Sequence, residues 1–94
     1  GFPKRLGVRQ QWMDRVELAG VIANGRCYKG NKGRWITFLT LGTDYGEYID
    51  VVVQKPFSYR DGDIVHGSGK VKHSNNSDYI DSNDVKSYTF AEWR

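Results

Sequence analysis

The stretch of residues 34–53, RWITFLTLGTDYGEYIDVVV, constrains the fold more than any other part of the chain. Residues 35–41 are rich in β-branched and aromatic side chains, which favour a strand. Residues 42–46 carry two glycines and an aspartate, the residue types that reverse a chain tightly. Residues 48–53 alternate between apolar and more polar side chains, as in a strand with one buried face. The stretch therefore predicts a β-hairpin.

The sequence assigns the buried face of the second strand more firmly than that of the first. In the second strand Ile49, Val51 and Val53 form the apolar face, so Tyr48 is expected on the outer face. In the first strand two registers remain open, with either of these sets pointing inward: Trp35, Thr37, Leu39 and Leu41, or Ile36, Phe38 and Thr40. Trp35 is therefore as compatible with a core position as with a surface position.

A further strand is predicted before the hairpin. Within residues 14–24, Val16, Leu18 and Ile22 share one face, with Gly20 between them. A glycine in the middle of a strand commonly marks a bulge or a bend. We therefore expect a first strand that bends at its glycine and serves two neighbours, as a small closed barrel requires.

Two more strands are predicted after the hairpin. Residues 64–73 alternate, with Gly67 and Gly69 on the inward face, and residues 79–90 form a last strand interrupted by the polar residues 82–84. Residues 55–63 form a connector in which a proline ends the preceding strand. We expect the aromatic side chains of this connector, Phe57 and Tyr59, to close one end of a barrel.

Five short strands, frequent turn signals and no sustained helical period predict an all-β barrel or sandwich. The order of the segments resembles the OB-fold, and the resemblance implies a five-stranded Greek-key barrel with little or no helix. It is carried chiefly by residues 62–67, GDIVHG, and 79–86, YIDSNDVK, which are similar to the fourth and fifth OB strands. The connector at 55–63 departs from the pattern, because it is too short for the usual helix. The resemblance covers roughly residues 16–88. The OB-fold proteins that the chain resembles most are small single-stranded-DNA-binding proteins.

The chain of 94 residues is expected to form one domain with short extensions. We expect a basic N-terminal arm at 1–13, an OB-like barrel at 14–90 and a C-terminal tail at 91–94. Trp93 in that tail is expected to pack on the barrel or on a neighbouring subunit. The chain begins with Gly1 rather than methionine, which indicates a processed chain, a fragment or a tagged product.

Positive charge is concentrated in the first third of the sequence. Residues 1–34 hold eight Lys or Arg against two acidic residues, a balance of +6, whereas residues 35–94 hold six basic and nine acidic residues, a balance of −3. Such asymmetry favours a surface that faces a polyanion. A solvated loop that keeps the protein soluble would explain the charge equally well.

The OB resemblance implies a binding surface on the second and third strands, flanked by the loops after the first and fourth strands. Exposed aromatic rings can stack on bases while neighbouring cations contact phosphates. The candidate nucleic-acid-binding residues are Arg26, Tyr28, Lys29, Lys32, Arg34, Trp35, Tyr45, Tyr48, Lys70 and Lys72. Of these, Lys70 and Lys72 are as compatible with plain solvent exposure as with binding.

The leading hypothesis is non-catalytic binding of single-stranded nucleic acid, with DNA favoured over RNA and a homo-oligomer or protein partners possible. An alternative is an OB-type protein-interaction subunit, an oligomeric adaptor in a larger assembly. The outward apolar positions Ala19, Val21, Ala23 and Val52 would suit such contacts. Carbohydrate binding, as in secreted OB subunits, is disfavoured because a single cysteine cannot form an internal disulfide.

Catalysis, metals and membranes find little support in the sequence. The pair Ser68 and His66 is of a kind common by chance, and loop 25–34 lacks the spacing of a phosphate-binding P-loop. One cysteine and two histidines disfavour a zinc site, and no cofactor is expected. No apolar run approaches the roughly 20 residues of a membrane span, and no signal peptide is visible. We therefore expect a cytoplasmic protein that is not an enzyme.

Overall fold

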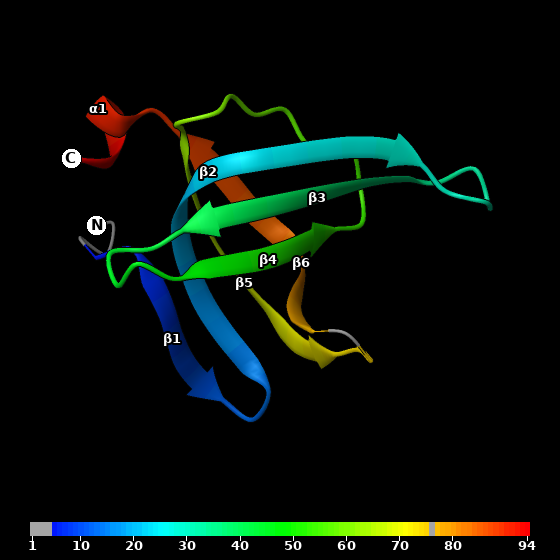
Figure 1. The fold of residues 1–94 in the computed structure, drawn as a ribbon, viewed down its shortest axis with the longest axis horizontal. Helices are drawn as coiled ribbons and strands as arrows, with labels where there is room; N and C mark the ends of the chain where they lie inside the picture. Colours follow the sequence, from blue (N-terminus) through cyan, green and yellow to red (C-terminus); the bar gives the residue numbers. More distant parts are fainter. Residues whose placement is uncertain (1–4, 76) are drawn as a thin grey trace.

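The computed structural model describes residues 5–75 and 77–94, which form strands and one short helix (Figure 1). The elements are β1 (Gly7–Trp12), β2 (Arg15–Lys29), β3 (Trp35–Gly42), β4 (Tyr48–Val53), β5 (Ile64–His73), β6 (Asp78–Tyr88) and α1 (Phe90–Trp93). The predicted all-β class with little helix is confirmed, as is the hairpin at 34–53. Strand β1 is additional to the five that the sequence predicts.

Five of the strands close into a barrel of mixed direction. β2 pairs antiparallel with both β3 and β5, and β3 pairs antiparallel with β4. β4 and β6 run parallel, and β6 pairs antiparallel with β5. The order β2-β3-β4-β6-β5 returns to β2, so the sheet closes on itself.

β2 organises the barrel because it changes neighbours along its length. Its residues 15–21 pair with β5, and its residues 21–29 pair with β3. A Cβ atom on Gly20, near this change, would lie 2.6 Å from the Cβ of Leu41, so glycine allows the two strands to approach. The strand curves strongly here (Figure 1), as the sequence predicts.

The barrel interior decides the register of β3. Thr37, Leu39 and Leu41 are buried, whereas Phe38 is exposed, so the first of the two open registers is the correct one. The hydroxyl of Thr37 donates to the carbonyl oxygen of Lys55 at 2.9 Å, which satisfies a buried polar group. The inward positions predicted for β2 and β4 pack in or against the core, whereas Ala19, Val52 and Ile64, predicted on outward faces, are also buried. The core consists of Val16, Leu18, Ile22, Leu39, Leu41, Val51, Val53, Val65, Ile80 and Val85.

The hairpin of β2 and β3 continues beyond the barrel as a two-stranded ribbon (Figure 1). Trp35 lies on the same side of β3 as the buried Thr37, yet its side chain is 47 % exposed because no core lies beneath it at this point. Phe57 and Tyr59 pack against the core cluster, and the Tyr59 ring lies against Gly25 near the base of the ribbon, in agreement with the expected closure of one barrel end.

The glycines of β5 lie where β6 crosses closely. A Cβ on Gly67 would overlap the carbonyl oxygen of Asp84, and one on Gly69 would lie 2.6 Å from the carbonyl oxygen of Asp81. The last strand does not end at the predicted interruption, because β6 runs from Asp78 to Tyr88, but its pairing with β5 shifts register there, from Ser68 with Asp84 to Lys70 with Asp81. The polar residues fit because Ser82 is buried and donates to the carbonyl oxygen of Ser68, at a bulge where Ser82 and Asn83 of β6 lie opposite Gly69 of β5.

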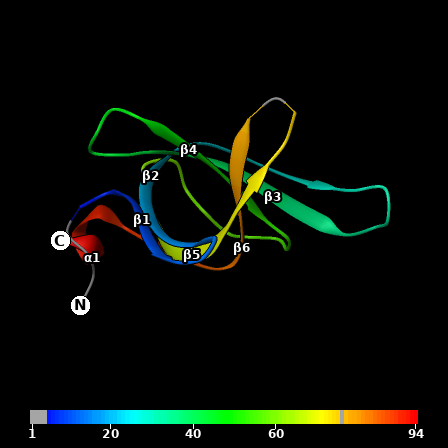
Figure 2. The ribbon, with the colours of Figure 1, turned by 90° about the horizontal axis from the view of Figure 1, so that it is seen from below.

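A second, smaller cluster covers the outer side of the barrel at β2 and β5. It consists of Leu6, Ala19, Ile64 and Trp93, with Trp93 only 7 % exposed. Trp93 thus packs on the barrel, one of the two expected positions. Figure 2 shows α1 and β1 at one end of the molecule and the tip of the β2–β3 ribbon at the other.

Part of the expected N-terminal arm is a strand. Residues 7–12 form β1, which pairs antiparallel with β2, while residues 1–4 lie outside the described residues. β1 has no apolar period because nearly all of its residues are exposed, so the sequence gives no signal for it. It is held by its ladder to β2 and by Leu6, whose backbone N–H donates to the carboxylate of Asp44 at 3.0 Å.

Helix α1 is fixed by a capping box. The backbone N–H of Glu92 donates to the hydroxyl of Thr89 at 3.1 Å, and the backbone N–H of Thr89 donates to the carboxylate of Glu92 at 2.8 Å. The backbone N–H of Thr89 first, and its hydroxyl second, stabilise the ionised Glu92 carboxyl and hold the pKa of Glu92 below its ordinary value. The expected tail at 91–94 is therefore an ordered helical turn that carries Trp93 onto the barrel.

Candidate binding groove

A groove of about 700 Å³ lies on the outer face of β2, β3 and β4 and reaches the connection between β5 and β6. Its lining is aromatic and polar, with few charges. The lining residues are Asn24, Gly25, Arg26, Tyr28, Ile36, Phe38, Leu39, Thr40, Asp50, Val51, Val52, Gln54, Ser74, Ser77 and Tyr79.

Strand register brings the aromatic and polar side chains of this lining to one face, whereas Leu39 and Val51 belong to the core beneath it. Arg26 is the partner of Phe38 across β2 and β3, and Phe38 is the partner of Val52 across β3 and β4. One pleat further along β3, Thr40 is the partner of Asp50. Because directly paired residues point to the same side of a sheet, the inward register of Leu39 and Leu41 forces this set outward.

The centre of the groove is a pair of stacked aromatic rings. Tyr28 and Phe38 have ring centroids 5.2 Å apart and planes within 6° of parallel. Both side chains remain partly open to solvent, at 43 % and 38 % exposed. Two near-parallel rings offer a flat apolar ledge on which another planar group can stack.

Polar groups surround this ledge. The hydroxyl of Thr40 donates to a carboxylate oxygen of Asp50 at 3.3 Å. Asn24 and Gln54 supply amides, and Tyr79 with the serines of the β5–β6 connection lines the opposite side. The groove therefore holds hydrogen-bond donors and acceptors around an apolar platform, a combination typical of small-ligand and base-binding sites.

Positive charge gathers on the ribbon beside the groove. The sequence contains no acidic residue from 18 to 43, and Arg26, Lys29, Lys32 and Arg34 fall within this span. Within residues 5–75 and 77–94, none of these four cations takes part in an ion pair. The ribbon turn is ordered by a hydrogen bond from the Gly30 N–H to the Arg34 carbonyl at 2.7 Å. Arg26 lines the groove and the other three cations lie further along the ribbon, so this end of the molecule is electropositive.

All ten predicted site residues are exposed, but only two line the groove. Those two are Arg26 and Tyr28. Lys29, Lys32 and Arg34 belong to the adjoining ribbon end. Tyr48 lies at the start of β4, on its outer face.

The remaining predicted residues lie elsewhere. Trp35 pairs with Lys29, on the side of the ribbon opposite Tyr28. Lys72 pairs with the groove residue Tyr79 and so lies one strand beyond the groove. Lys70 borders a separate polar hollow with Lys72, Arg15 and Asp81.

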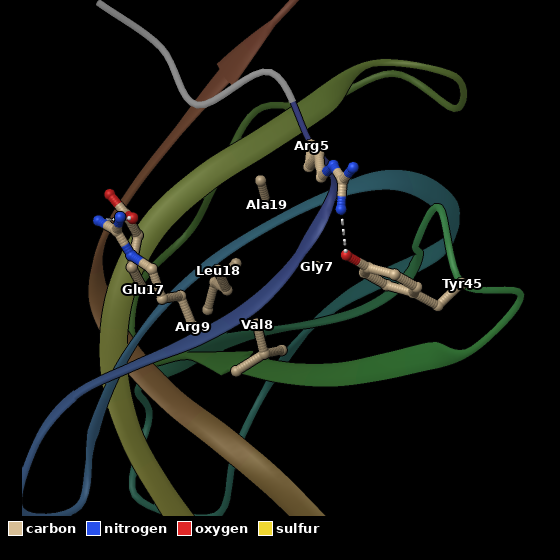
Figure 3. A pocket seen from close by; sticks show the side chains of 8 residues that line it. All are labelled: Arg5, Gly7, Val8, Arg9, Glu17, Leu18, Ala19 and Tyr45. Atoms are coloured by element: carbon tan, nitrogen blue, oxygen red, sulfur yellow. Dashed lines mark hydrogen bonds and ion pairs between the residues drawn. The ribbon is translucent and has the colours of Figure 1, made fainter.

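Tyr45 belongs to a different hollow, near the N-terminal strand (Figure 3). Its hydroxyl accepts a hydrogen bond from the Arg5 guanidinium at 3.2 Å, and its ring covers Gly7. In the same hollow, Arg9 forms an ion pair with Glu17 at 2.6 Å. The cations here already have partners, unlike those of the ribbon.

Sequence reasoning missed several groove residues, including Phe38, Asp50 and Tyr79. The sequence left two registers open for β3. The register with Leu39 and Leu41 inward would have placed Phe38 on the outer face, beside Tyr28. Asp50 follows Tyr48 by two positions and shares its outer face, so the alternation of β4 already contains the signal.

Comparison with known proteins assigns the chain to no family. The chain matches no protein-family model and no curated protein at a significant level. Among residues 5–75 and 77–94, no cluster of three or more His, Cys, Asp or Glu side chains could hold a metal ion. No helix in that part of the chain has the length and apolar character needed to cross a membrane.

Proposed function

We propose that the protein binds single-stranded nucleic acid in the groove on the outer face of β2, β3 and β4, without catalysis. The observation that carries the proposal is the exposed Tyr28–Phe38 stack on a ribbon with four cations that form no ion pair with any described residue. Bases would stack on the rings, and phosphates would follow the basic ribbon. The expected gain is roughly 1–3 kcal/mol for each stacked base.

The fold supports the same proposal. The barrel order β2-β3-β4-β6-β5, closed by a parallel pair between β4 and β6, is compatible with an OB-like fold. OB-folds bind oligonucleotides on the face of their second and third strands, between the loops after the first and fourth. In this chain those elements correspond to β3, β4, the ribbon turn and the β5–β6 connection, where the groove lies.

The proposal is tested by fluorescence anisotropy of a labelled single strand of about 12 nucleotides, within the range of OB site sizes. If all four ribbon cations contact phosphates, raising salt from about 50 to about 200 mM should weaken binding about fifty-fold. A duplex of the same sequence should bind more weakly, because its bases are not free to stack. An RNA strand of that sequence tests the preference for DNA.

Two variants make the test specific to the groove. Phe38→Ala should weaken binding strongly, whereas Trp12→Ala, which removes an exposed ring from the distant β1–β2 hairpin, should not. Absence of binding by wild-type protein at low salt, for DNA and RNA alike, would refute the proposal. Equal losses in the two variants would show that the groove is not the site.

A protein-interaction role is the second candidate, and one observation favours it. Trp12 and Met13, at the turn between β1 and β2, are 66 % and 76 % exposed. Of the outward apolar positions that suggested an adaptor, Ala19 is covered by Leu6 and Trp93, so the chain itself uses that surface. Sedimentation of wild-type protein and Trp12→Ala tests this candidate, which requires an assembly that the substitution weakens.

A further inference from the structure

Asp50 is the one carboxylate in the lining of the groove. An acidic side chain is unfavourable for a surface that holds a polyanion, because it repels phosphates. Its presence in the lining of this groove therefore calls for a role other than phosphate contact. The residue lies in the middle of β4, on the outer face, and is exposed.

The position of Asp50 relative to the aromatic ledge is set by strand register. Val52, two residues further along β4, is the direct partner of Phe38, so Asp50 lies diagonally across from Phe38. Diagonal neighbours in a sheet are about 7–8 Å apart. A base stacked on the ledge would therefore extend its hydrogen-bonding edge toward the carboxylate.

The carboxylate is oriented but still available. One oxygen accepts the hydroxyl hydrogen of Thr40 at 3.3 Å. Among the described residues, the other oxygen accepts no hydrogen bond from a side chain. An ionised carboxylate only accepts hydrogen bonds, so the open oxygen can pair only with a donor on the ligand.

We propose that Asp50 makes the groove selective for bases that present an amino group, with cytosine favoured over thymine or uracil. The N4 amino group of cytosine donates to a carboxylate, as aspartate and glutamate do in reading cytosine. Thymine and uracil present a carbonyl oxygen at the same place, and its lone pairs face those of Asp50. This inference rests on the proposed function, because it assigns a base preference to the same groove.

Simple charge repulsion is a different effect with a different signature. A negative charge weakens the binding of every strand to a similar extent, whatever its bases. A hydrogen bond to the amino group changes only the ratio between bases. The ratio of the two affinities therefore separates the inference from electrostatics.

The experiment compares the affinities of oligo(dC) and oligo(dT) of one length, by anisotropy at slightly alkaline pH where cytosine is neutral. Wild-type protein should bind oligo(dC) about fivefold more tightly, at the lower end of the discrimination measured for base contacts. Asp50→Asn should bring this ratio close to one, because an amide can donate to thymine as well as accept from cytosine.

Glu47→Gln is the matched control, since it removes one exposed negative charge from the β3–β4 turn, outside the groove. It should leave the ratio unchanged. A wild-type ratio of one, or a preference that survives in Asp50→Asn, would overturn the inference while single-strand binding stands. If neither oligonucleotide nor a mixed sequence binds, the proposed function fails first.

Discussion

The two halves of β2 have different surroundings, because the first lies in the barrel and the second extends into the exposed ribbon. Residues 15–21 run between β1 and β5 and bury Val16 and Leu18 in the core. Among the described strands, residues 24–29 pair with β3 alone, and they extend into the ribbon with exposed cations and Tyr28. The side chains of the first half stabilise the fold by packing in the core. Those of residues 26–29 are exposed, so they can contact a ligand without disturbing the core.

One glycine substitution in each region compares how tightly the two regions are packed. Gly67 lies in β5, which pairs with the first half of β2, and Gly67→Ala forces a Cβ into the carbonyl oxygen of Asp84. We expect it to lower the free energy of unfolding by at least about 3 kcal/mol, the upper range for overpacking. Gly30→Ala, in the ribbon, places its Cβ 3.5 Å from the nearest atom, an ordinary contact, and should change stability little.

Urea denaturation monitored by circular dichroism measures both variants. Similar losses in the two would mean that the ribbon is as tightly packed as the barrel. That result would remove the basis for treating the halves differently.

Stability and affinity should also respond to different side chains. Leu18→Ala opens a cavity in the core and should lower the free energy of unfolding by roughly 2–5 kcal/mol. Phe38→Ala removes a partly exposed ring, so it should cost about 1 kcal/mol of stability, near the value of an aromatic pair. Its effect on single-strand affinity should be larger, roughly 1–3 kcal/mol.

Leu18→Ala should therefore have the larger effect on stability and Phe38→Ala the larger effect on affinity. Denaturation and anisotropy on the same preparations measure both quantities. An affinity loss in Phe38→Ala that merely follows its stability loss would contradict a direct role in binding.

The end of the molecule far from the ribbon offers a smaller test. Thr89→Ala removes the N-cap of α1 and should destabilise the fold by about 1 kcal/mol without changing affinity for nucleic acid. The lowered pKa of Glu92 makes the stability depend on pH. The ionised carboxyl contributes to the free energy of unfolding above the ordinary pKa of 4.5, and this contribution is lost as pH falls through the lowered pKa.

In Glu92→Gln this acid-dependent part should disappear, because the titrating carboxyl is removed, whereas Thr89→Ala keeps the backbone N–H that lowers the pKa most. Denaturation at neutral and acidic pH measures both variants. Unchanged acid dependence would show that the capping box does not stabilise the barrel.

The smallest expected effect concerns a single ribbon cation. Lys32→Gln should reduce the salt slope of binding by about 0.7, the contribution of one phosphate contact to a single strand. Across a fourfold range of salt, the change in affinity should fall from about fifty-fold to about twenty-fold. Lys86→Gln, on β6 outside the groove lining, is the control and should leave the slope unaltered.

Most of the barrel could be predicted because its strands alternate. Val16, Leu18 and Ile22 on one face, with Gly20 between them, specified a bent strand with a single buried side. β1 could not be predicted, because an exposed strand held by backbone pairing leaves no apolar pattern. The continuity of β6 was hidden because its buried Ser82 is satisfied by the carbonyl of Ser68, a residue distant in sequence.

The candidate site was predictable only in part, and for the same physical reason. The charge of the ribbon is local in sequence, so Arg26, Lys29 and Lys32 could be grouped directly. The groove depends on which face of β3 is buried, and two apolar faces left that choice open. Once Leu39 and Leu41 point inward, Phe38 must join Tyr28 on the outer face.

The most direct test of the account is a map of backbone amide shifts during titration of the labelled protein with a single-stranded oligonucleotide. We predict that the largest shifts fall at residues 24–29, 36–40 and 50–54, the strands that line the groove. The amides of β1 and α1, at the opposite end, should move little. The largest shifts around Trp12 and Trp93, with a quiet ribbon, would contradict the account.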